Sequence, residues 1–260
     1  MAKRVTTSSQ AADSYTAGMS HWSEEMVDAM PQLDRFHYDL LAPYLGPRTL
    51  EIGAGDGRVT PLVANSERVA RYVVIEPSGY FFDVLQKRFA ADPRVELIQS
   101  DAKGVLPSYG SSFDCVFSIH VMEHIEDDRA FIEESLSLTR EGGHVVVQVP
   151  AGQFLYSDLD RNIGHFRRYD KRRIRELVSG LNCDLKLLRY SNLLGVLVSL
   201  VFIKFLRLEY QSSERDAQRF FALYRLYSRV VIPIATALER VVPVPFGLNL
   251  TAVLEKKAPA

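Results

Sequence analysis

The chain has 260 residues, 47% of them hydrophobic and 24% charged, which is enough to bury one large core. Its 31 basic and 32 acidic side chains give a formal net charge of -1, so no overall field attracts DNA or RNA, and we expect no nucleic-acid partner. Two cysteines are too few for a secreted disulfide framework, and the first residues lack the apolar run of a signal peptide, so we expect a cytoplasmic protein.

From about residue 30, apolar β-branched runs alternate with amphipathic segments, a pattern typical of a parallel sheet with helices on both faces. Helices are predicted up to residue 66, after an N-cap at Ser78, around residues 132–138 and over residues 170–179. Residues 191–249 interrupt this order with a hydrophobic, largely helical insertion. The predicted strands cover residues 48–52, 71–76, 95–100, 113–119, 142–150, 185–190 and 250–256.

A glycine-rich loop follows the first predicted strand. The segment LEIGAGDGR places Gly53, Gly55 and Gly57 between this strand and a helix, where glycine lets the backbone turn tightly and approach a ligand. The spacing is G-x-G-x-G and not the G-x-G-x-x-G of dinucleotide binders, so NAD fits poorly. The loop therefore predicts a different nucleotide-type cofactor at the carboxyl edge of the sheet.

Acidic side chains stand at the ends of neighbouring predicted strands. Glu51 precedes the glycines, Glu76 ends the second strand, and Asp101 follows the third. A carboxylate at the position of Glu76 can accept hydrogen bonds from both ribose hydroxyls, and Asp101 with Ala102 can meet an adenine ring. The alternative is a tight turn with unrelated surface acids, but the succession at consecutive strand ends favours a nucleoside site.

Five segments resemble, in order and spacing, the motifs of class I S-adenosylmethionine-dependent methyltransferases. They are LEIGAGDG, VVIEPS, QSDAKGVLP, FDCVFSIHVMEHIED and EGGHVVVQVP, within residues 48–150. The resemblance implies an α/β, Rossmann-like, doubly wound sheet of seven mostly parallel strands with an antiparallel last strand. It also implies S-adenosyl-L-methionine as the cofactor and S-adenosyl-L-homocysteine as the product.

The same resemblance assigns positions around the cofactor. Glu51 and the glycines would lie by the methionine part, Glu76 at the ribose, and Asp101 with Ala102 at the adenine. The full set of expected cofactor-binding residues is Tyr15, Trp22, Glu51, Gly53, Ala54, Gly55, Gly57, Glu76, Pro77, Asp101, Ala102 and His120.

The rest of the chain resembles one bacterial branch of these enzymes, through segments such as YSDLDRNIGHFRRYDKRRIRELV and ERVVPVPFGLNLTAVLEKK. Genes of this branch often accompany glycan, lipid-linked sugar or natural-product metabolism. We expect an amino-terminal helical cap over the cofactor site at residues 1–47, a methyltransferase core at residues 48–190 and 250–260, and the helical insertion at residues 191–249.

A hydroxyl or ammonium acceptor must lose a proton, and a histidine, with a free pKa of about 6.5, suits that task. His165 is the first candidate for the base or for orienting the acceptor, and the other expected catalytic residues are Asp160 beside it and His120 near the cofactor. For His124, a packing role and a role in the site both stay open. The alternative for His165 is a folded elbow, in which it and the neighbouring arginines bond to backbone carbonyls. No usual ligand spacing supports a metal, so none is expected.

The segment RNIGHFRRYDKRRIR, residues 161–175, carries seven Lys or Arg side chains in fifteen positions. On the helix over residues 170–179 these charges form a solvated face. The arginines before it lie on a loop that overhangs the site, where a guanidinium fork could hold a carboxylate or phosphate of the acceptor. The expected acceptor-binding residues are Tyr156, Arg167, Arg168 and Tyr169.

Residues 191–249 combine apolar runs with cations, but no window reaches the roughly 18 apolar residues of a spanning helix. The insertion could form a lid over an apolar acceptor, a homodimer contact or a peripheral contact at the inner face of the membrane, and these alternatives stay open. We expect methyl transfer to a small-molecule or lipid-linked acceptor, at oxygen. The alternatives are a cyclisation of natural-product biosynthesis on the same fold, or a non-catalytic cofactor-binding module.

Overall fold

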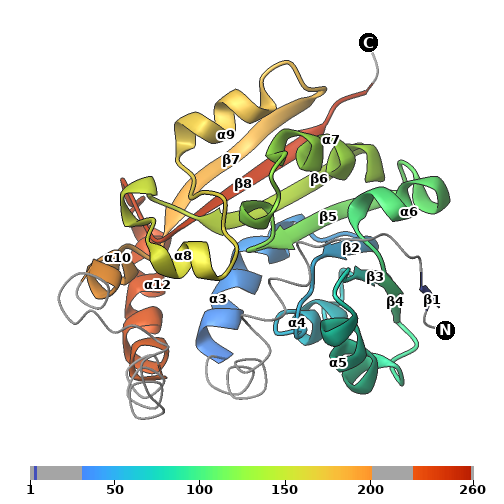
Figure 1. Cartoon of the computed structure of the whole chain (residues 1–260), viewed down its shortest axis with the longest axis horizontal. Helices are drawn as coiled ribbons and strands as arrows, with labels where there is room; N and C mark the ends of the chain where they lie inside the picture. The colour runs from blue at the N-terminus through green and yellow to red at the C-terminus, as the bar shows by residue number, and fades with distance from the viewer. Residues whose placement is uncertain (1–2, 5–30, 201–224, 259–260) are drawn as a thin grey trace.

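One mixed sheet forms the centre of the molecule (Figure 1). The computed structural model describes residues 3–4, 31–200 and 225–258. The order of the strands across the sheet is β1-β4-β3-β2-β5-β6-β8-β7, and β8 runs antiparallel to β6 and β7 while the other pairs are parallel. The strands are β1 (Lys3–Arg4), β2 (Arg48–Ile52), β3 (Arg71–Ile75), β4 (Val95–Gln99), β5 (Phe113–Ile119), β6 (Thr139–Pro150), β7 (Cys183–Ser191) and β8 (Asn249–Lys256).

The predicted seven-stranded sheet with an antiparallel last strand is confirmed. The two-residue strand β1 is an addition at the edge, where it pairs with β4. The ends of the other strands differ from the predicted ends by at most three residues. The valine run of β6 is buried because β6 lies between β5 and β8 and its two faces are covered, as a parallel sheet with helices on both sides requires.

The helices lie where the amphipathic pattern places them, with two additions. Ser78 caps α5 by accepting a hydrogen bond from the Phe81 amide, and Asp170 caps α9 by accepting one from the Arg173 amide at 2.7 Å, as predicted. The additions are α6 and α8. The helices are α3 (Pro31–Leu41), α4 (Thr60–Ala64), α5 (Gly79–Phe89), α6 (Ala102–Tyr109), α7 (Asp128–Leu138), α8 (Asp158–Asn162), α9 (Lys171–Val178), α10 (Leu193–Leu200) and α12 (Ile232–Val241), with shorter turns η1 (Ala42–Tyr44), η2 (Met122–His124), η3 (Gln153–Leu155) and the π-helical η5 (Tyr227–Val231).

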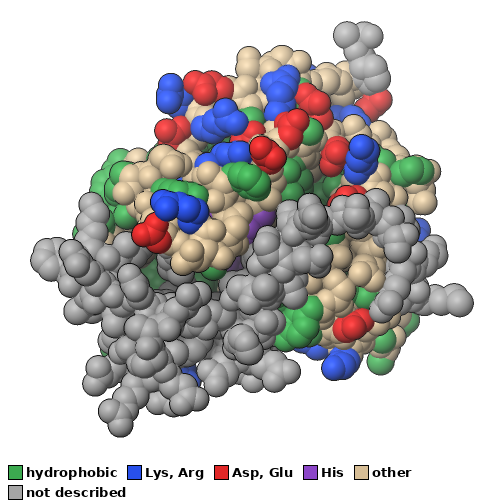
Figure 2. Space-filling model, in the orientation of Figure 1, with side chains coloured by type: hydrophobic (Ala, Val, Ile, Leu, Met, Phe, Trp, Pro, Cys, Tyr) green, Lys and Arg blue, Asp and Glu red, His purple; other side chains and the backbone are tan. Residues whose placement is uncertain are grey.

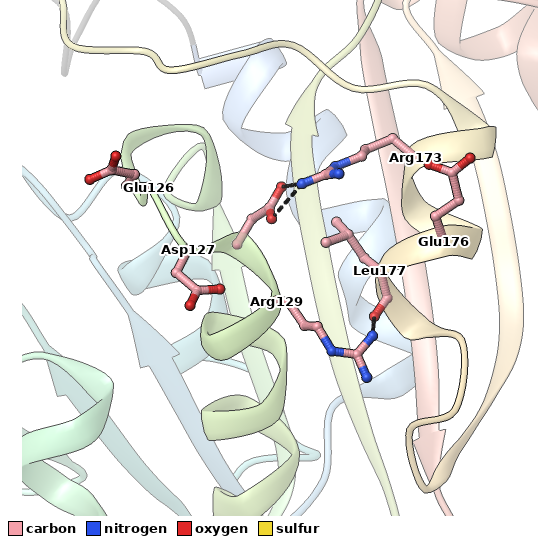
Figure 3. A pocket seen from close by; sticks show the side chains of 7 residues that line it. Glu126, Asp127, Arg129, Arg173, Glu176 and Leu177 are labelled. Carbon is pink, nitrogen blue, oxygen red and sulfur yellow. Dashed lines mark hydrogen bonds and ion pairs between the residues drawn. The ribbon is translucent and has the colours of Figure 1, made fainter.

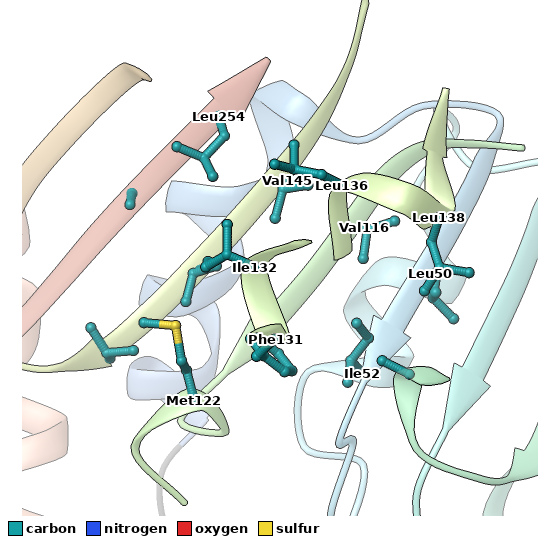
Figure 4. Close-up of a cluster of buried hydrophobic side chains, with 14 of the residues drawn as sticks. Leu50, Ile52, Val116, Met122, Phe131, Ile132, Leu136, Leu138, Val145 and Leu254 are labelled. Atoms are coloured by element: carbon teal, nitrogen blue, oxygen red, sulfur yellow. The ribbon is translucent and has the colours of Figure 1, made fainter. Parts of the chain in front are cut away.

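Apolar layers cover the two faces of the sheet. On one face, α6, α7 and α9 pack on the strands through side chains such as Val105, Ile132 and Leu177 (Figure 4 shows the part beneath α7). On the other face, α4 and α5 contribute Val63 and Phe82 to a second cluster. Since the sheet is held from both sides, the loops at the carboxyl ends of its strands start from fixed positions.

The described part of residues 191–249 is largely helical, as expected, although residues 242–248 form no helix. Its helices α10 and α12 and the turn η5 form a small separate cluster with α3, which includes Leu33, Phe36, Tyr227 and Ile232. Within the described residues, no helix has both the length and the apolar character needed to span a membrane. Tyr15 and Trp22, and most of the expected cap, lie outside the described residues, so the predicted division into a cap, a core and an insertion stays a prediction.

Candidate functional site

A cavity of about 280 Å³ opens at the carboxyl ends of β2, β3, β4 and β5. Seven of the expected cofactor-binding residues line it: Gly53, Gly55, Glu76, Pro77, Asp101, Ala102 and His120. The other lining residues, which sequence reasoning did not assign to the cofactor, are Ile52, Ser78, Lys103, Val121, His124, Ile125, Phe131 and Glu134.

The glycine loop forms one wall of this cavity. Gly53 has a φ of +69°, its amide donates to the Ile75 carbonyl at 2.8 Å, and a Cβ atom there would lie 2.6 Å from Cγ2 of Val121. A side chain at this position would therefore clash with the residue that follows β5. Gly55 has a φ of +57° and a Cβ atom there would meet nothing within 4 Å. The loop thus leaves open space beside Gly55, as a backbone that receives a ligand must.

Glu76 stands opposite the glycine loop, with its carboxylate buried. One oxygen, Oε2, accepts a hydrogen bond from the Gly55 amide at 2.9 Å, and Oε1 accepts one from the Ser78 amide at 2.9 Å. Burial raises the pKa of Glu76 to about 7, against the effect of these two hydrogen bonds. Each carboxylate oxygen keeps a second lone pair. The carboxylate therefore fits the two hydroxyls of a ribose.

Asp101 and Ala102 occupy the next strand end, beside the same cavity. The carboxylate of Asp101 accepts a hydrogen bond from the Gly104 amide at 2.8 Å and so begins α6. An acid, an alanine and the start of a helix at this place fit the edge of an adenine ring, so the residues present are suited to a nucleoside cofactor.

Glu51 does not line the cavity. Its buried carboxylate accepts hydrogen bonds from the Thr60 hydroxyl at 2.8 Å and from the Tyr72 hydroxyl, and burial raises its pKa to about 7. Ala54 and Gly57 are likewise absent from the lining, and a Cβ atom on Gly57 would lie 2.7 Å from Cδ2 of Leu85. Glu51 and Gly57 thus support the loop from behind, and the expected contact of Glu51 with the methionine part stays a prediction.

The other half of the cavity carries two histidines, His120 and His124. His120 directly follows β5 and has a φ of +54°, a backbone conformation that is uncommon outside glycine. Its Nδ1 lies 3.2 Å from Oε1 of Glu123, and its ring meets the ring of His37 edge-on at 5.4 Å. His37 is buried, and its Nδ1 lies 2.6 Å from Oε1 of Gln148. In Figure 2 a histidine is visible in purple within the hollowed centre of the face.

Glu123 is the residue of this site that sequence reasoning missed. It is completely buried, and three imidazoles surround its carboxylate: those of His120, His124 and His165. Burial alone would raise its pKa, but the hydrogen bond from His120 and the neighbouring histidines lower the pKa below its ordinary value. Burial lowers the pKa of His124 to about 4, so His124 is neutral at pH 7 and His120 provides the main stabilisation. The only sequence signal was the pair of Glu123 and His124 directly after a strand end.

His165 lies behind this cluster and does not line the cavity. Its Nδ1 is 2.8 Å from Oδ1 of Asp160, its Nε2 is 3.8 Å from Oε1 of Glu123, and its ring centre is 4.6 Å from that of His124. Asp160 also binds the guanidinium of Arg168 with both carboxylate oxygens, at 2.8 and 3.0 Å. Burial alone would raise the pKa of Asp160, but the hydrogen bonds from His165 and Arg168 lower this pKa to about 2.

Three of the predicted acceptor-binding residues make contacts within the protein, and their acceptor-binding role stays a prediction. Arg168 is only 10% exposed and is engaged with Asp160, and Arg167 donates to the carbonyls of Ile125 and Glu126 at 2.9 and 2.8 Å. Tyr169 is fully buried, with its hydroxyl directed to a backbone carbonyl. Of the alternative folded elbow, the structure contains the bonds from Arg167 to backbone carbonyls, whereas His165 and Arg168 contact the carboxylate of Asp160. Tyr156 donates to the His165 carbonyl at 2.7 Å, and its acceptor contact stays a prediction.

The rest of the basic segment also binds to the protein itself. Arg173 of α9 holds both carboxylate oxygens of Asp128 at the start of α7, at 2.8 and 3.0 Å, and Arg129 donates to the Leu177 carbonyl at 2.9 Å (Figure 3). Lys171, Arg172 and Arg175 remain as the charges of the outer helix. Basic and acidic side chains are intermixed on the face shown in Figure 2, with no continuous basic stripe there.

Comparisons with known proteins agree with this geometry. Residues 50–147 match the family described as "Methyltransferase domain". A demethylmenaquinone methyltransferase of Clavibacter sepedonicus is 32% identical over 107 residues, which are 41% of this chain and 42% of that protein. Residues 50–147 form a class I S-adenosylmethionine-dependent methyltransferase domain. This domain has S-adenosyl-L-methionine as its cofactor, which fits the cavity described above.

Solved structures extend the likeness of this methyltransferase domain to most of the chain. The N-methyltransferase NodS of Bradyrhizobium japonicum WM9, solved with S-adenosylhomocysteine, superposes with a TM-score of 0.57 at 13% identity and covers 96% of this chain and 100% of NodS. The [4+2]-cyclase SpnF superposes with a TM-score of 0.56 at 16% identity and covers 87% of this chain and 82% of SpnF. At these identities the likeness shows the fold alone. The chain spans about two fifths of the length of the curated relatives that it matches.

Replacing Gly55 by valine should abolish cofactor binding without unfolding the protein. The side chain would enter the space that faces the glycine loop, and the positive φ would cost about 1–2 kcal/mol of stability. Gly180→Val is the matched control, because Gly180 has a φ of +76° and open space around its Cβ position but lies outside the cavity. Calorimetry with S-adenosylhomocysteine should show at least tenfold weaker binding for the first variant only, and equal losses would contradict the assignment.

The affinity for S-adenosylhomocysteine should fall as the pH falls from 8 to 6. Glu76 has a pKa of about 7 in the free protein, and ribose hydroxyls bind its charged form best, so protonation below pH 7 opposes binding. We expect a loss of roughly tenfold over this range in calorimetric titrations. Glu76→Gln should bind more weakly at pH 8 and lack this dependence, which separates Glu76 from Glu51 and from the ligand's own groups. A wild-type affinity that is constant over the range would refute the ribose contact.

Proposed function

We propose that this protein transfers the methyl group of S-adenosyl-L-methionine to a small-molecule or lipid-linked acceptor, at an oxygen atom. The observation that carries the proposal is one cavity whose two halves have different chemistry. One half holds Gly55, Glu76 and Asp101, which suit a nucleoside, and the other holds His120 and His124. When bound, the cofactor supplies a methyl group already activated on a sulfonium, so the protein has to align the acceptor and take up its proton.

His120 is the proposed base. The carboxylate of Glu123 can only accept hydrogen bonds, so Nδ1 of His120 is the donor in this 3.2 Å contact. This fixes the tautomer and leaves Nε2 as the atom that receives a proton. His165 and Asp160 act in this proposal as positioning residues, since they reach the cavity only through Glu123 and His124.

The proposed acceptor has an apolar body. The apolar lining of the cavity includes Val121, Ile125 and Phe131, and the arginines of the elbow are engaged within the protein. The curated relatives, whose names include a demethylmenaquinone methyltransferase and a trans-aconitate 2-methyltransferase, act on chemically different acceptors. The choice of acceptor therefore rests on this lining and not on the comparisons.

We further propose a peripheral contact with a membrane surface, which would bring the protein to a lipid-linked acceptor. Large apolar side chains on and around α12 are exposed, among them Leu238 at 60% and Val241 at 82%. Arg225 and Arg229 are exposed nearby in sequence, and such a combination favours an interface with anionic lipids. The exposed apolar residues of this region are Leu226, Val230, Ile234, Leu238, Val241, Val242 and Phe246.

The test of the main proposal is the formation of S-adenosylhomocysteine. Purified protein, S-adenosyl-L-methionine and metabolite or lipid extracts should give S-adenosylhomocysteine together with a product heavier by one methyl group, detected by mass spectrometry. A product without S-adenosylhomocysteine would indicate a cyclisation instead. Binding of the cofactor without any reaction across the extracts would indicate a non-catalytic module.

His120→Asn should lower the rate of that reaction at least a hundredfold, because it removes the base, while affinity for S-adenosylhomocysteine stays within a few-fold. Asparagine is chosen because it tolerates the positive φ at this position. His144→Asn, which changes a histidine on β6 beside Glu255, is the control and should keep full activity. Full activity in His120→Asn would remove His120 from the mechanism.

The membrane contact predicts partial sedimentation with anionic liposomes, decreasing as salt rises because ionic screening weakens the attraction of the arginines. Ile234→Glu combined with Leu238→Glu should abolish it. Phe154→Glu, which replaces a side chain on η3 that is 63% exposed, should not. A protein that stays in the supernatant at low salt would refute the contact, as would a dimer in solution that the double variant dissociates.

A further inference from the structure

Three side chains converge beside the cavity and form a group that could hold a metal ion. Glu123 and His124 come from η2, and His165 comes from the loop after α8, so the group joins segments that are about forty residues apart. Their ligand atoms all lie within 4.8 Å of one another. No sequence motif indicates this group, because the spacing of the three residues follows no usual ligand pattern.

One oxygen of this group lacks a partner. Oε2 of Glu123 is buried and has no hydrogen-bond partner among the described residues, while Oε1 lies 3.2 Å from Nδ1 of His120. A buried carboxylate oxygen without a donor costs free energy, and such groups in native proteins commonly mark a bound water or ion. This observation is independent of the clustering, and it points to a ligand beside Glu123.

His124 and His165, the two histidines of this group, have the same tautomer. Nδ1 of His165 is 2.8 Å from Oδ1 of Asp160, and Nδ1 of His124 is 3.3 Å from the Gly164 carbonyl oxygen. Both oxygens can only accept, so Nδ1 carries the proton in each ring and Nε2 carries the lone pair. A histidine that binds a metal usually donates its other nitrogen to a carboxylate or carbonyl in this way. Asp160 is in turn fixed by Arg168.

We propose that Glu123, His124 and His165 bind one divalent transition-metal cation, for which Zn²⁺ is the reference. Two imidazole nitrogens and one carboxylate oxygen are donors that suit this class of ion. Ligand atoms at about 2.1 Å from zinc stand roughly 3.4 Å apart in a tetrahedron, so small side-chain rotations close the observed separations. Since His124 lines the cavity, an ion could reach this group from the cavity.

A role for this ion rests on the proposed function, whereas its binding does not. Methyl transfer to oxygen needs an acceptor that loses its proton, and a cation that coordinates the acceptor oxygen lowers the pKa of that oxygen. His120 would remain hydrogen-bonded to Oε1 of Glu123 and take up the proton. The site would thereby select acceptors that offer an oxygen ligand next to an apolar body.

The experiment uses Co²⁺ as a spectroscopic substitute for Zn²⁺ on the full chain, freed of metals by a chelator. Titration should produce visible d–d absorption that saturates at one equivalent, and Zn²⁺ should displace it. His124→Gln and His165→Gln should each weaken Co²⁺ binding at least tenfold. His144→Gln is the matched control, because His144 also stands beside a carboxylate, with Nε2 at 3.7 Å from Glu255, and its variant should bind as the wild type does.

Folding of each variant is checked by its melting temperature and by S-adenosylhomocysteine binding. X-ray absorption at the zinc edge of the wild type, which needs no variant, should show two imidazole ligands. The proposal is overturned if the wild type binds neither ion below about 100 µM, if zinc shows no imidazole ligation, or if both folded variants bind as the wild type does.

Cation binding is measured without cofactor or acceptor. A protein that forms S-adenosylhomocysteine but binds no cation therefore refutes this proposal alone, and one that binds the cation but transfers no methyl group refutes the proposed function alone.

Discussion

The completely buried carboxylate of Glu123 determines how the acceptor side of the cavity is built. A charge without water needs polar groups around it: Nδ1 of His120 donates to Glu123, and the rings of His124 and His165 lie close by, from two loops that are distant in sequence. A chain of contacts runs from Arg168 through Asp160 and His165 to Glu123, and on to His120. Each member fixes the orientation of the next, so the histidines at the cavity are held in place by charges that never reach it.

The cofactor side depends on a simpler constraint. The carboxyl ends of adjacent parallel strands lie at one edge of the sheet, so residues that follow β2, β3 and β4 meet there whatever their separation along the chain. This is why sequence alone could place Gly55, Glu76 and Asp101 together, and the three residues do line one cavity. The same reasoning gave no means to separate Gly55, which faces open space, from Gly57, which packs against α5.

The strands were predictable because each is a short apolar run bounded by turn residues, whereas α6 and α8 were not. The eight residues of α6 include Gly104 and Pro107, which local rules place outside helices, and α8 has only five residues.

The side-chain contacts on the histidine side of the cavity could not be predicted from the sequence either. The pattern of residues 161–175 shows how many charges there are, but it does not show that their partners are Asp160 and the segment from Ile125 to Asp128.

The partners of the arginines in residues 161–175 show what this basic segment does within the fold. Arg167 ties the elbow to the carbonyls that precede α7, and Arg173 ties α9 to Asp128 at the start of α7. The arginines thus fasten the loop after β6 to the loop after β5, which is the junction where Glu123 lies. The carboxylates of Asp128 and Asp160 lie beside these guanidinium groups and offset part of their charge. The cavity beside this junction has an apolar lining that includes Val121, Ile125 and Phe131.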